Sequence, residues 1–184
     1  IDIFPYERSQ ATDLIEDFML AANETIAQDA YWQELPFLYR IHEEPDNEKI
    51  ASLSQMIAAF GYGIKGVKSG SAVHSKELQK LLRKCQDTPE EAFISRLALR
   101  SLKQARYAGE CAGHFGLAAK YYCHFTSPIR RYPDLFIHRI LKENLKGRLY
   151  DSRLSHYHEI LDGIAKQTSS LEEERMMQSA IPIS

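Results

Sequence analysis

The sequence is poor in the groupings of cysteine, histidine and aspartate that hold metal ions. Its three cysteines, Cys85, Cys111 and Cys123, are scattered, odd in number and without CxxC spacing. This pattern argues against a disulfide framework or a zinc site and predicts reduced thiols in a cytoplasmic protein. The histidines form no HExxH motif, and no Asp-Asp or Asp-x-Asp pair occurs. We therefore predict no metal site within this chain.

Long apolar runs and a strong net charge are also missing. No run approaches the roughly 20 apolar residues that span a bilayer, so we expect no membrane partner. The net charge of −2 does not by itself indicate a nucleic-acid binder. Basic residues nevertheless gather in 120–148, where seven lysines and arginines stand against two acidic residues. Such a local basic segment can bind phosphate whatever the total charge of the chain.

Helical periodicity is the main structural signal, and it predicts a mainly α chain. Apolar residues recur at three- and four-residue steps in 9–31, where Leu14, Ile15 and Phe18 belong to one expected apolar face. Residues 35–42 are rich in aromatic and β-branched side chains and predict a strand or extended connector. Further helices are expected at 46–60, 75–85, 88–106, 132–146 and from 152 past 171.

Two local signals refine this pattern. Thr88, Pro89 and Glu91 have the order of a capping box, which predicts a helix that begins at Thr88 and runs to about Arg106. Three glycines in 107–118 argue against helix in that segment. His114 lies between two of them, where the backbone can come close to a ligand.

The densest group of reactive side chains lies in 121–135. Pro128 fixes its own φ and disfavours the α region for the residue before it, which predicts a turn just before Arg130 and Arg131. Adjacent guanidiniums repel each other, and each presents a planar fork that matches phosphate oxygens. A helix start with surface arginines is the simpler interpretation of an isolated pair. The hydroxyl, imidazole and aromatic groups around this pair favour a phosphate-binding site.

A nucleophilic hydrolase is a weaker interpretation of the same segment. Ser127 and His124 are close in sequence, but no third orienting group and no GxSxG elbow accompanies them. Electrostatic stabilisation by arginine beside an anionic centre is therefore the favoured chemistry.

Several long motifs in a fixed order resemble the ribonuclease II/R (RNB) exoribonuclease family and, within it, the bacterial ribonuclease R group. GHFGLA at 113–118 is followed by HFTSPIRRYPDL at 124–135. Ordered long motifs are stronger evidence than one short pattern. Shorter segments that resemble the family are EDFMLAAN at 16–23, RIHEEP at 40–45, RSLKQA at 100–105 and SSLEEER at 169–175.

The resemblance implies part of a processive 3′→5′ exoribonuclease that uses Mg²⁺, takes the 3′ end of single-stranded RNA and releases nucleoside 5′-monophosphates. It implies a catalytic role for Arg130 beside the scissile phosphate. It implies another for Glu172, with Glu174 left open as the alternative register of the last motif. The aspartate cluster that binds the metal in the family has no counterpart here, so Mg²⁺ would be held mainly by residues absent from this chain.

Ten further residues are expected to contact RNA. Glu16 matches a family carboxylate near the terminal sugar, where accepting the 2′-hydroxyl proton would distinguish RNA from DNA. The expected RNA-binding residues are Glu16, Asn23, Arg40, His42, His114, His124, Thr126, Ser127, Arg131 and Tyr132.

The resemblance also predicts the domain organisation. Residues 1–184 correspond to the C-terminal part of one RNB catalytic domain, a mainly helical fragment of a larger α/β fold. Its partners would be the aspartate-bearing half of that domain and the flanking OB-type RNA-binding domains of the same polypeptide, and the fragment alone would be inactive. Two alternatives stay open: a non-catalytic RNA-binding module of the same fold, and a helical domain with no role in RNA.

Overall fold

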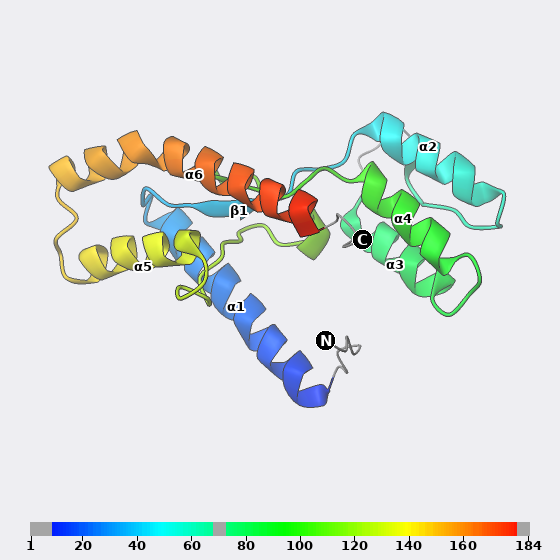
Figure 1. Cartoon of the computed structure of the whole chain (residues 1–184), viewed down its shortest axis with the longest axis horizontal. Helices are drawn as coiled ribbons and strands as arrows, with labels where there is room; N and C mark the ends of the chain where they lie inside the picture. The colour runs from blue at the N-terminus through cyan, green and yellow to red at the C-terminus, as the bar shows by residue number, and fades with distance from the viewer. Residues whose placement is uncertain (1–8, 68–72, 180–184) are drawn as a thin grey trace. The chain divides into compact units, whose positions relative to one another are not determined.

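A computed structural model describes residues 9–67 and 73–179 of the chain. Helices predominate, and β1 and β2 pair into a two-stranded sheet, which confirms the prediction of a mainly α chain. Across the described ranges, no helix has the length and apolarity needed to cross a membrane. In chain order the elements are α1 (Gln10–Trp32), β1 (Tyr39–Ile41), α2 (Asn47–Ala58), α3 (Ser75–Cys85), α4 (Glu91–Ser101), β2 (Arg106–Ala108), the 3₁₀ helix η2 (Phe115–Leu117), α5 (Tyr132–Leu145) and α6 (Asp151–Ser179) (Figure 1).

The chain divides into two compact units. Unit 1 takes the described parts of Ile1–Arg40, Tyr107–Cys111 and Tyr121–Ser184. Unit 2 takes the described parts of Ile41–Arg106 and Ala112–Lys120. Each unit therefore combines segments that lie far apart in the sequence.

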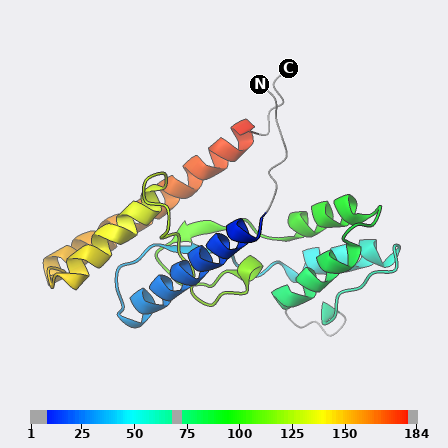
Figure 2. The same ribbon diagram turned by 90° about the horizontal axis from the view of Figure 1, so that it is seen from below.

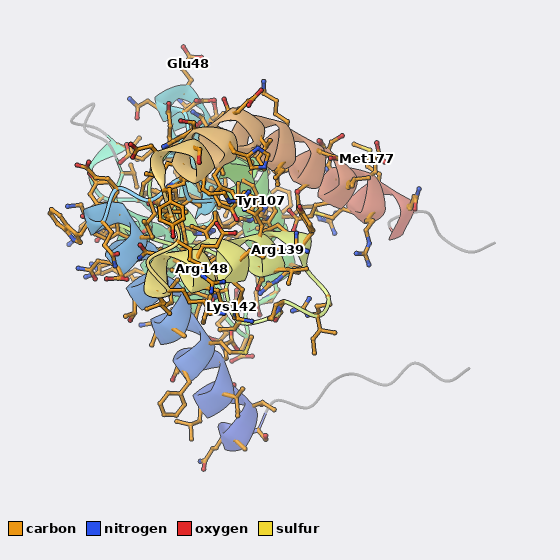
Figure 3. All side chains as sticks on the ribbon, turned by 90° about the vertical axis from the view of Figure 1, so that its left-hand side faces the viewer. Glu48, Tyr107, Arg139, Lys142, Arg148 and Met177 are labelled. Atoms are coloured by element: carbon orange, nitrogen blue, oxygen red, sulfur yellow. The ribbon has the colours of Figure 1, made fainter. Side chains whose placement is uncertain are left out.

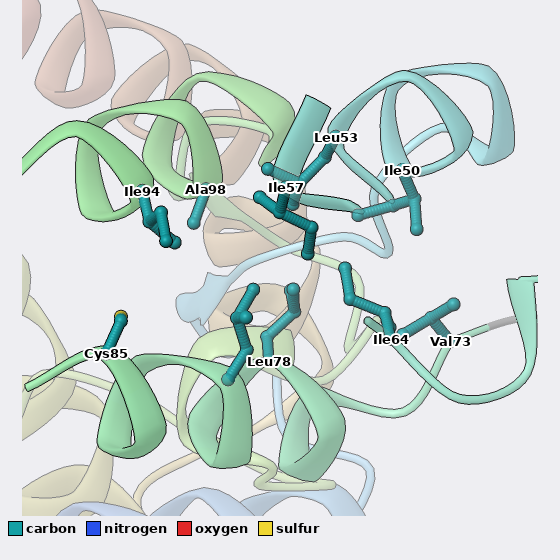
Figure 4. Packing of buried hydrophobic residues seen from close by; sticks show 10 residues of the cluster. Ile50, Leu53, Ile57, Ile64, Val73, Leu78, Cys85, Ile94 and Ala98 are labelled. Atoms are coloured by element: carbon teal, nitrogen blue, oxygen red, sulfur yellow. The ribbon is translucent and has the colours of Figure 1, made fainter. Parts of the chain in front are cut away.

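Unit 2 is built on the apolar faces of three helices. Contacts of α4 with both α2 and α3 enclose a common core. Most of its side chains come from inward positions that the helical periodicity predicts, whereas Ile64 and Val73 lie outside the helices; Figure 4 shows the core side chains converging between the helices. The buried core residues are Ile50, Leu53, Ile57, Ile64, Val73, Leu78, Leu81, Cys85, Ile94 and Ala98.

The predicted capping box at the start of α4 is wrong in its details. The helix begins at Glu91, and no side chain caps its first turn. The Thr88 hydroxyl donates to the carbonyl of Cys85 at 2.6 Å, and the Glu91 carboxylate accepts from the N–H of Asp87 at 2.8 Å. Both side chains thus bond to backbone groups that precede α4 in the sequence. They close the turn after α3 and do not cap the first turn of α4.

The strand β2 was not predicted. The helix expected to reach Arg106 ends at Ser101, and Arg106 instead begins three residues that pair with β1. A strand of this length has too few residues to show a period of two, so pairing with a distant segment decides it.

In unit 1, α5 and α6 lie side by side and run in opposite directions (Figures 1 and 2). The rings of Phe136 and Tyr157 meet edge to face with centroids 5.7 Å apart. Arg153 of α6 donates to both carboxylate oxygens of Glu143 of α5, at 2.7 and 3.1 Å. Both predicted helices are confirmed, and these contacts hold α6 against α5.

The first half of α1 corrects the predicted burial of its apolar face. Leu14, Ile15 and Phe18 are 57%, 60% and 67% exposed. Burial begins in the second half of the helix, at Asn23 and Ala27. The described residues thus leave an apolar surface open on the first turns of α1, and surfaces of this kind commonly mark an interaction site.

Candidate functional site

A tight turn precedes α5 at the position that the proline predicts. The carbonyl of Ser127 accepts hydrogen bonds from the N–H groups of Arg130 and Arg131, at 3.3 and 3.1 Å. Pro133 occupies the first turn of α5, where its missing N–H has no helical partner to lose. The turn therefore delivers two arginines to the N-terminal end of a helix, which favours anions.

Asp134 anchors this turn, a role that the sequence analysis missed. Its side chain is fully buried, and its Oδ1 accepts from the Ser127 N–H at 2.7 Å and from Arg131 Nη2 at 2.9 Å. A buried carboxylate with a charged partner and a backbone donor holds both in place. The only signal in the sequence was an acidic residue in the first turn of a helix.

Arg130 differs from its neighbour because it remains available. Its side chain is exposed, and no residue of the described ranges pairs with its guanidinium by a hydrogen bond or an ion pair. Arg131 is engaged by Asp134 and only 21% of its side chain is exposed. The two adjacent arginines therefore have different functions in the fold, and Arg130 is the one free to meet a ligand.

Arg130 lies at a cavity of about 400 Å³ in unit 1. One wall of the cavity is cationic and comes from the turn before α5. The other comes from the second half of α6 and combines polar, charged and apolar side chains. Tyr132, which is 48% exposed, belongs to the first wall. The lining residues are Tyr107, Arg130, Arg131, Tyr132, Pro133, Thr168, Leu171, Glu172, Arg175 and Met176.

Glu172 is the glutamate that faces this cavity. Its Oε2 lies 2.6 Å from Nη1 of Arg40, whose guanidinium also sits 4.6 Å above the ring centroid of Tyr107. Arg40 comes from β1 and Tyr107 from β2, so two strands orient a carboxylate on α6. Of the two registers that the sequence left open, Glu172 lines the cavity, whereas Glu174 is exposed and does not. The catalytic role of Glu172 remains a prediction.

The hydroxyl of Tyr107 links His124 to this network. It lies 2.7 Å from Nδ1 of His124. Burial raises the pKa of Tyr107 to about 12, so its hydroxyl stays protonated at neutral pH. Tyr107 thereby orients His124 through its hydroxyl and Arg40 through its ring, although nothing in the sequence pattern singled it out.

Asn23 holds the segment that leads to the turn. Its buried side-chain amide donates to the Tyr122 hydroxyl at 3.2 Å and accepts from the Phe125 N–H at 3.0 Å, while its backbone carbonyl accepts from the Cys123 thiol at 3.2 Å. These bonds use both ends of the side chain within the fold. An RNA contact by Asn23 stays a prediction, and the structure assigns the residue a positioning role.

Replacing Asn23 by alanine is expected to destabilise the complete protein by about 2 kcal/mol, because the Phe125 N–H and the Tyr122 hydroxyl lose a buried partner. Thermal unfolding measures the loss. Asn23→Asp keeps the acceptor for Phe125 and should be less destabilising than Asn23→Ala. Equal stability of Asn23→Ala and the parent protein would contradict the positioning role of Asn23.

His42 and His114 belong to unit 2 and line a second cavity of about 400 Å³. Nδ1 of His42 accepts from the Gly116 N–H at 3.2 Å, and the His114 N–H donates to the Ala119 carbonyl at 2.8 Å. A Cβ on Gly116 would lie 2.9 Å from that Nδ1, so the close approach requires glycine. Both histidines thus support the glycine-rich loop, and their contact with RNA stays a prediction.

Of the other predicted RNA-binding residues, two lie in the segment before α5 and one lies on α1. Ser127 and Thr126 belong to the segment before α5, where the buried Thr126 hydroxyl has no partner among the described residues. Glu16 is exposed on α1 and does not line the cavity at Arg130. Conversely, Thr168 and Arg175 line it without having been predicted; they lie about one helix turn on either side of Glu172 on α6.

The described part of the site contains no evident metal cage of its own. Across residues 9–67 and 73–179, no group of three or more histidine, cysteine, aspartate or glutamate residues converges as metal ligands do. The side chains that line the cavity at Arg130 are instead mainly cationic, hydrogen-bonding and apolar.

Comparison with known proteins identifies the family of this chain. A family model described as RNB domain matches residues 1–147, which include Arg130 and not Glu172. Ribonuclease R of Thermotoga maritima is 45% identical over 174 residues, which cover 94% of this chain and 24% of that protein. The chain thus spans about a quarter of the length of the curated relatives it matches.

Solved structures agree with this match. Mycoplasma genitalium ribonuclease R in complex with ribose-methylated single-stranded RNA superimposes with a TM-score of 0.82 at 30% identity, over 91% of this chain and 26% of that one. The yeast pseudonuclease Ssd1 superimposes with a TM-score of 0.72 at 27% identity, over 89% and 20%. The family model covers most of the chain, and the fold agrees with those of ribonuclease R structures. The chain therefore belongs to the RNB family.

Proposed function

We propose that this chain forms the arginine-bearing wall of the active site of a processive 3′→5′ exoribonuclease. The observation that supports this most directly is that Asp134 pairs with only one of the two arginines. Asp134 neutralises Arg131 and fixes the turn, so that Arg130 is presented unpaired, among the described residues, to a cavity that Glu172 also lines. A guanidinium without a protein partner has its full electrostatic interaction left for a phosphate.

In this proposal each side chain has a distinct task. Arg130 offsets the negative charge that develops on the scissile phosphate. Glu172 is held by Arg40 through one carboxylate oxygen, and its other oxygen makes no hydrogen bond to a described residue. That oxygen accepts a hydrogen bond from the bound substrate. His124, oriented by Tyr107, donates a hydrogen bond to a backbone oxygen of the RNA.

The remainder of the catalytic domain completes the site. Residues 1–184 act as the C-terminal part of one RNB domain, and aspartates elsewhere in the polypeptide would hold Mg²⁺, which would activate the attacking water and stabilise the leaving oxygen. The exposed Leu14, Ile15 and Phe18 on α1 support this view, because an apolar helix face of this kind packs against another element in a finished domain.

Single-stranded RNA with a free 3′ end is the proposed substrate. The relative from Mycoplasma genitalium was solved with single-stranded RNA and shares the fold of this chain. The complete protein should shorten 5′-labelled RNA stepwise, which a gel resolves. It should release nucleoside 5′-monophosphates, which chromatography identifies. The matched control is the same RNA with a blocked 3′ end, which should stay intact. Internal cleavage, or products with a 3′-phosphate, would contradict the proposal.

A non-catalytic RNA-binding module is the second candidate, and the likeness to the pseudonuclease Ssd1 favours it. The same assay separates the two, since a binding module retains labelled RNA without producing monophosphates. The sequence of the rest of the polypeptide gives an independent test. Four closely spaced aspartates there indicate the enzyme, and their replacement indicates the binder.

A further inference from the structure

The solvent-facing side of α5 carries a row of cations. Arg139, Lys142 and Lys146 follow one another at three- and four-residue steps, so they share one face, opposite the buried Ile137 and Ile140. All three are exposed. Figure 3 shows Arg139 and Lys142 at the yellow ribbon of α5. We call these three cations the basic stripe.

No described carboxylate pairs with the basic stripe. In the parts of the chain that the structure describes, no hydrogen bond or ion pair engages any of its three side chains. The carboxylates of α5 are used elsewhere: Asp134 binds Arg131, and Glu143 binds Arg153 of α6. The positive charge on this face is therefore uncompensated by described residues, in a chain whose net charge is −2.

A structural explanation accounts for only part of the stripe. Cations at the C-terminal end of a helix complement its dipole, which gives Lys142 in the last turn and Lys146 at the C-cap a reason to be there without any ligand. Arg139 lies more than one turn before the end of α5 and gains little from this effect. A purely solvated face would also be expected to mix both signs of charge.

The stripe is continuous with the candidate site. The same side of α5 begins at Tyr132, which lines the cavity together with Arg130. From Arg139 to Lys146 the stripe extends over about 10 Å of helix axis. A strand whose end occupies the cavity can therefore continue along α5 with its backbone beside successive cations.

We propose that the basic stripe binds the phosphate backbone of the RNA strand outside the cavity. The proposal rests on the proposed RNA-binding function and extends it to a second surface. Lysines and arginines on an exposed helix recognise phosphates by charge and not bases by identity. Each neutralised phosphate releases condensed counterions, so the stripe should be visible in the salt dependence of binding.

The test compares two triple variants of the complete protein. Arg139→Gln/Lys142→Gln/Lys146→Gln removes the basic stripe. Lys49→Gln/Lys103→Gln/Arg106→Gln removes the same charge from residues that are each paired with a carboxylate. Affinity for a long single-stranded RNA is measured over a range of salt concentrations, and thermal unfolding checks that both variants fold.

The stripe variant is expected to reduce the slope of log K against log salt by about 2, at roughly 0.7 for each phosphate that the stripe no longer neutralises. The control variant should keep the slope of the parent protein. Affinity for a short oligonucleotide that fills only the cavity should be the same in all three proteins.

Three outcomes would overturn the inference. An unchanged slope in the stripe variant, with parent binding intact, rejects the stripe and leaves the proposed function standing. An equal reduction of the slope in both triple variants shows an effect of net charge alone. Absence of RNA binding by the parent protein rejects the proposed function and the stripe with it.

Discussion

Replacing Arg130 by alanine in the complete protein is expected to lower the exonuclease rate constant by about 100-fold or more, which corresponds to roughly 2.7 kcal/mol of transition-state stabilisation. The effect should be large because Arg130 has no partner among the described residues, so its interaction with the phosphate is not shared. It should fall mainly on the rate of single-turnover hydrolysis, since charge on the phosphate develops in the transition state.

Two further replacements make this experiment specific. Arg130→Lys should recover only part of the rate, because an ammonium lacks the planar fork that engages two phosphate oxygens. Arg96→Ala, at an exposed position on α4 in unit 2, should leave the rate unchanged. A rate for Arg130→Ala within about tenfold of the parent, or roughly 1.4 kcal/mol, would show that Arg130 has no transition-state role.

Replacing Asp134 by alanine is expected to destabilise the catalytic domain by about 3 kcal/mol. Removal of one partner leaves the Arg131 guanidinium without its countercharge and the Ser127 N–H without its acceptor. The loss is measured as a lower unfolding temperature in a thermal scan. Glu159→Ala removes an exposed carboxylate from α6 and should have little effect.

The mechanism can be separated from a simple loss of packing. If the unpaired charge is the cause, Asp134→Ala combined with Arg131→Met should be more stable than Asp134→Ala alone, because the uncompensated cation is gone. If both variants unfold at the same temperature, the ion pair is not what anchors the turn. Activity of the double variant would also report on Arg130, whose position depends on the turn.

The helices and the family were predictable because their signals are local. Periodic apolar residues specify helix positions within a few turns, and the proline before Arg130 restricts its neighbours through contacts between adjacent residues. Ordered motifs identify the RNB family from contiguous letters alone. For the same reason, details that depend on competition between local partners, such as the bonds of Thr88 and Glu91, were predicted incorrectly.

The amino-acid sequence alone determined the family, most of the helices and a turn that presents two arginines. Only the tertiary structure decided that Arg130 is the free one among the described residues, since burial of Asp134 selects Arg131 as its partner. Likewise, the pair between Arg40 and Glu172 joins residues 132 positions apart, and no local pattern encodes such a contact. Exposure of the apolar face of α1 has the same origin, because periodicity shows which side is apolar, but only packing decides whether it is covered.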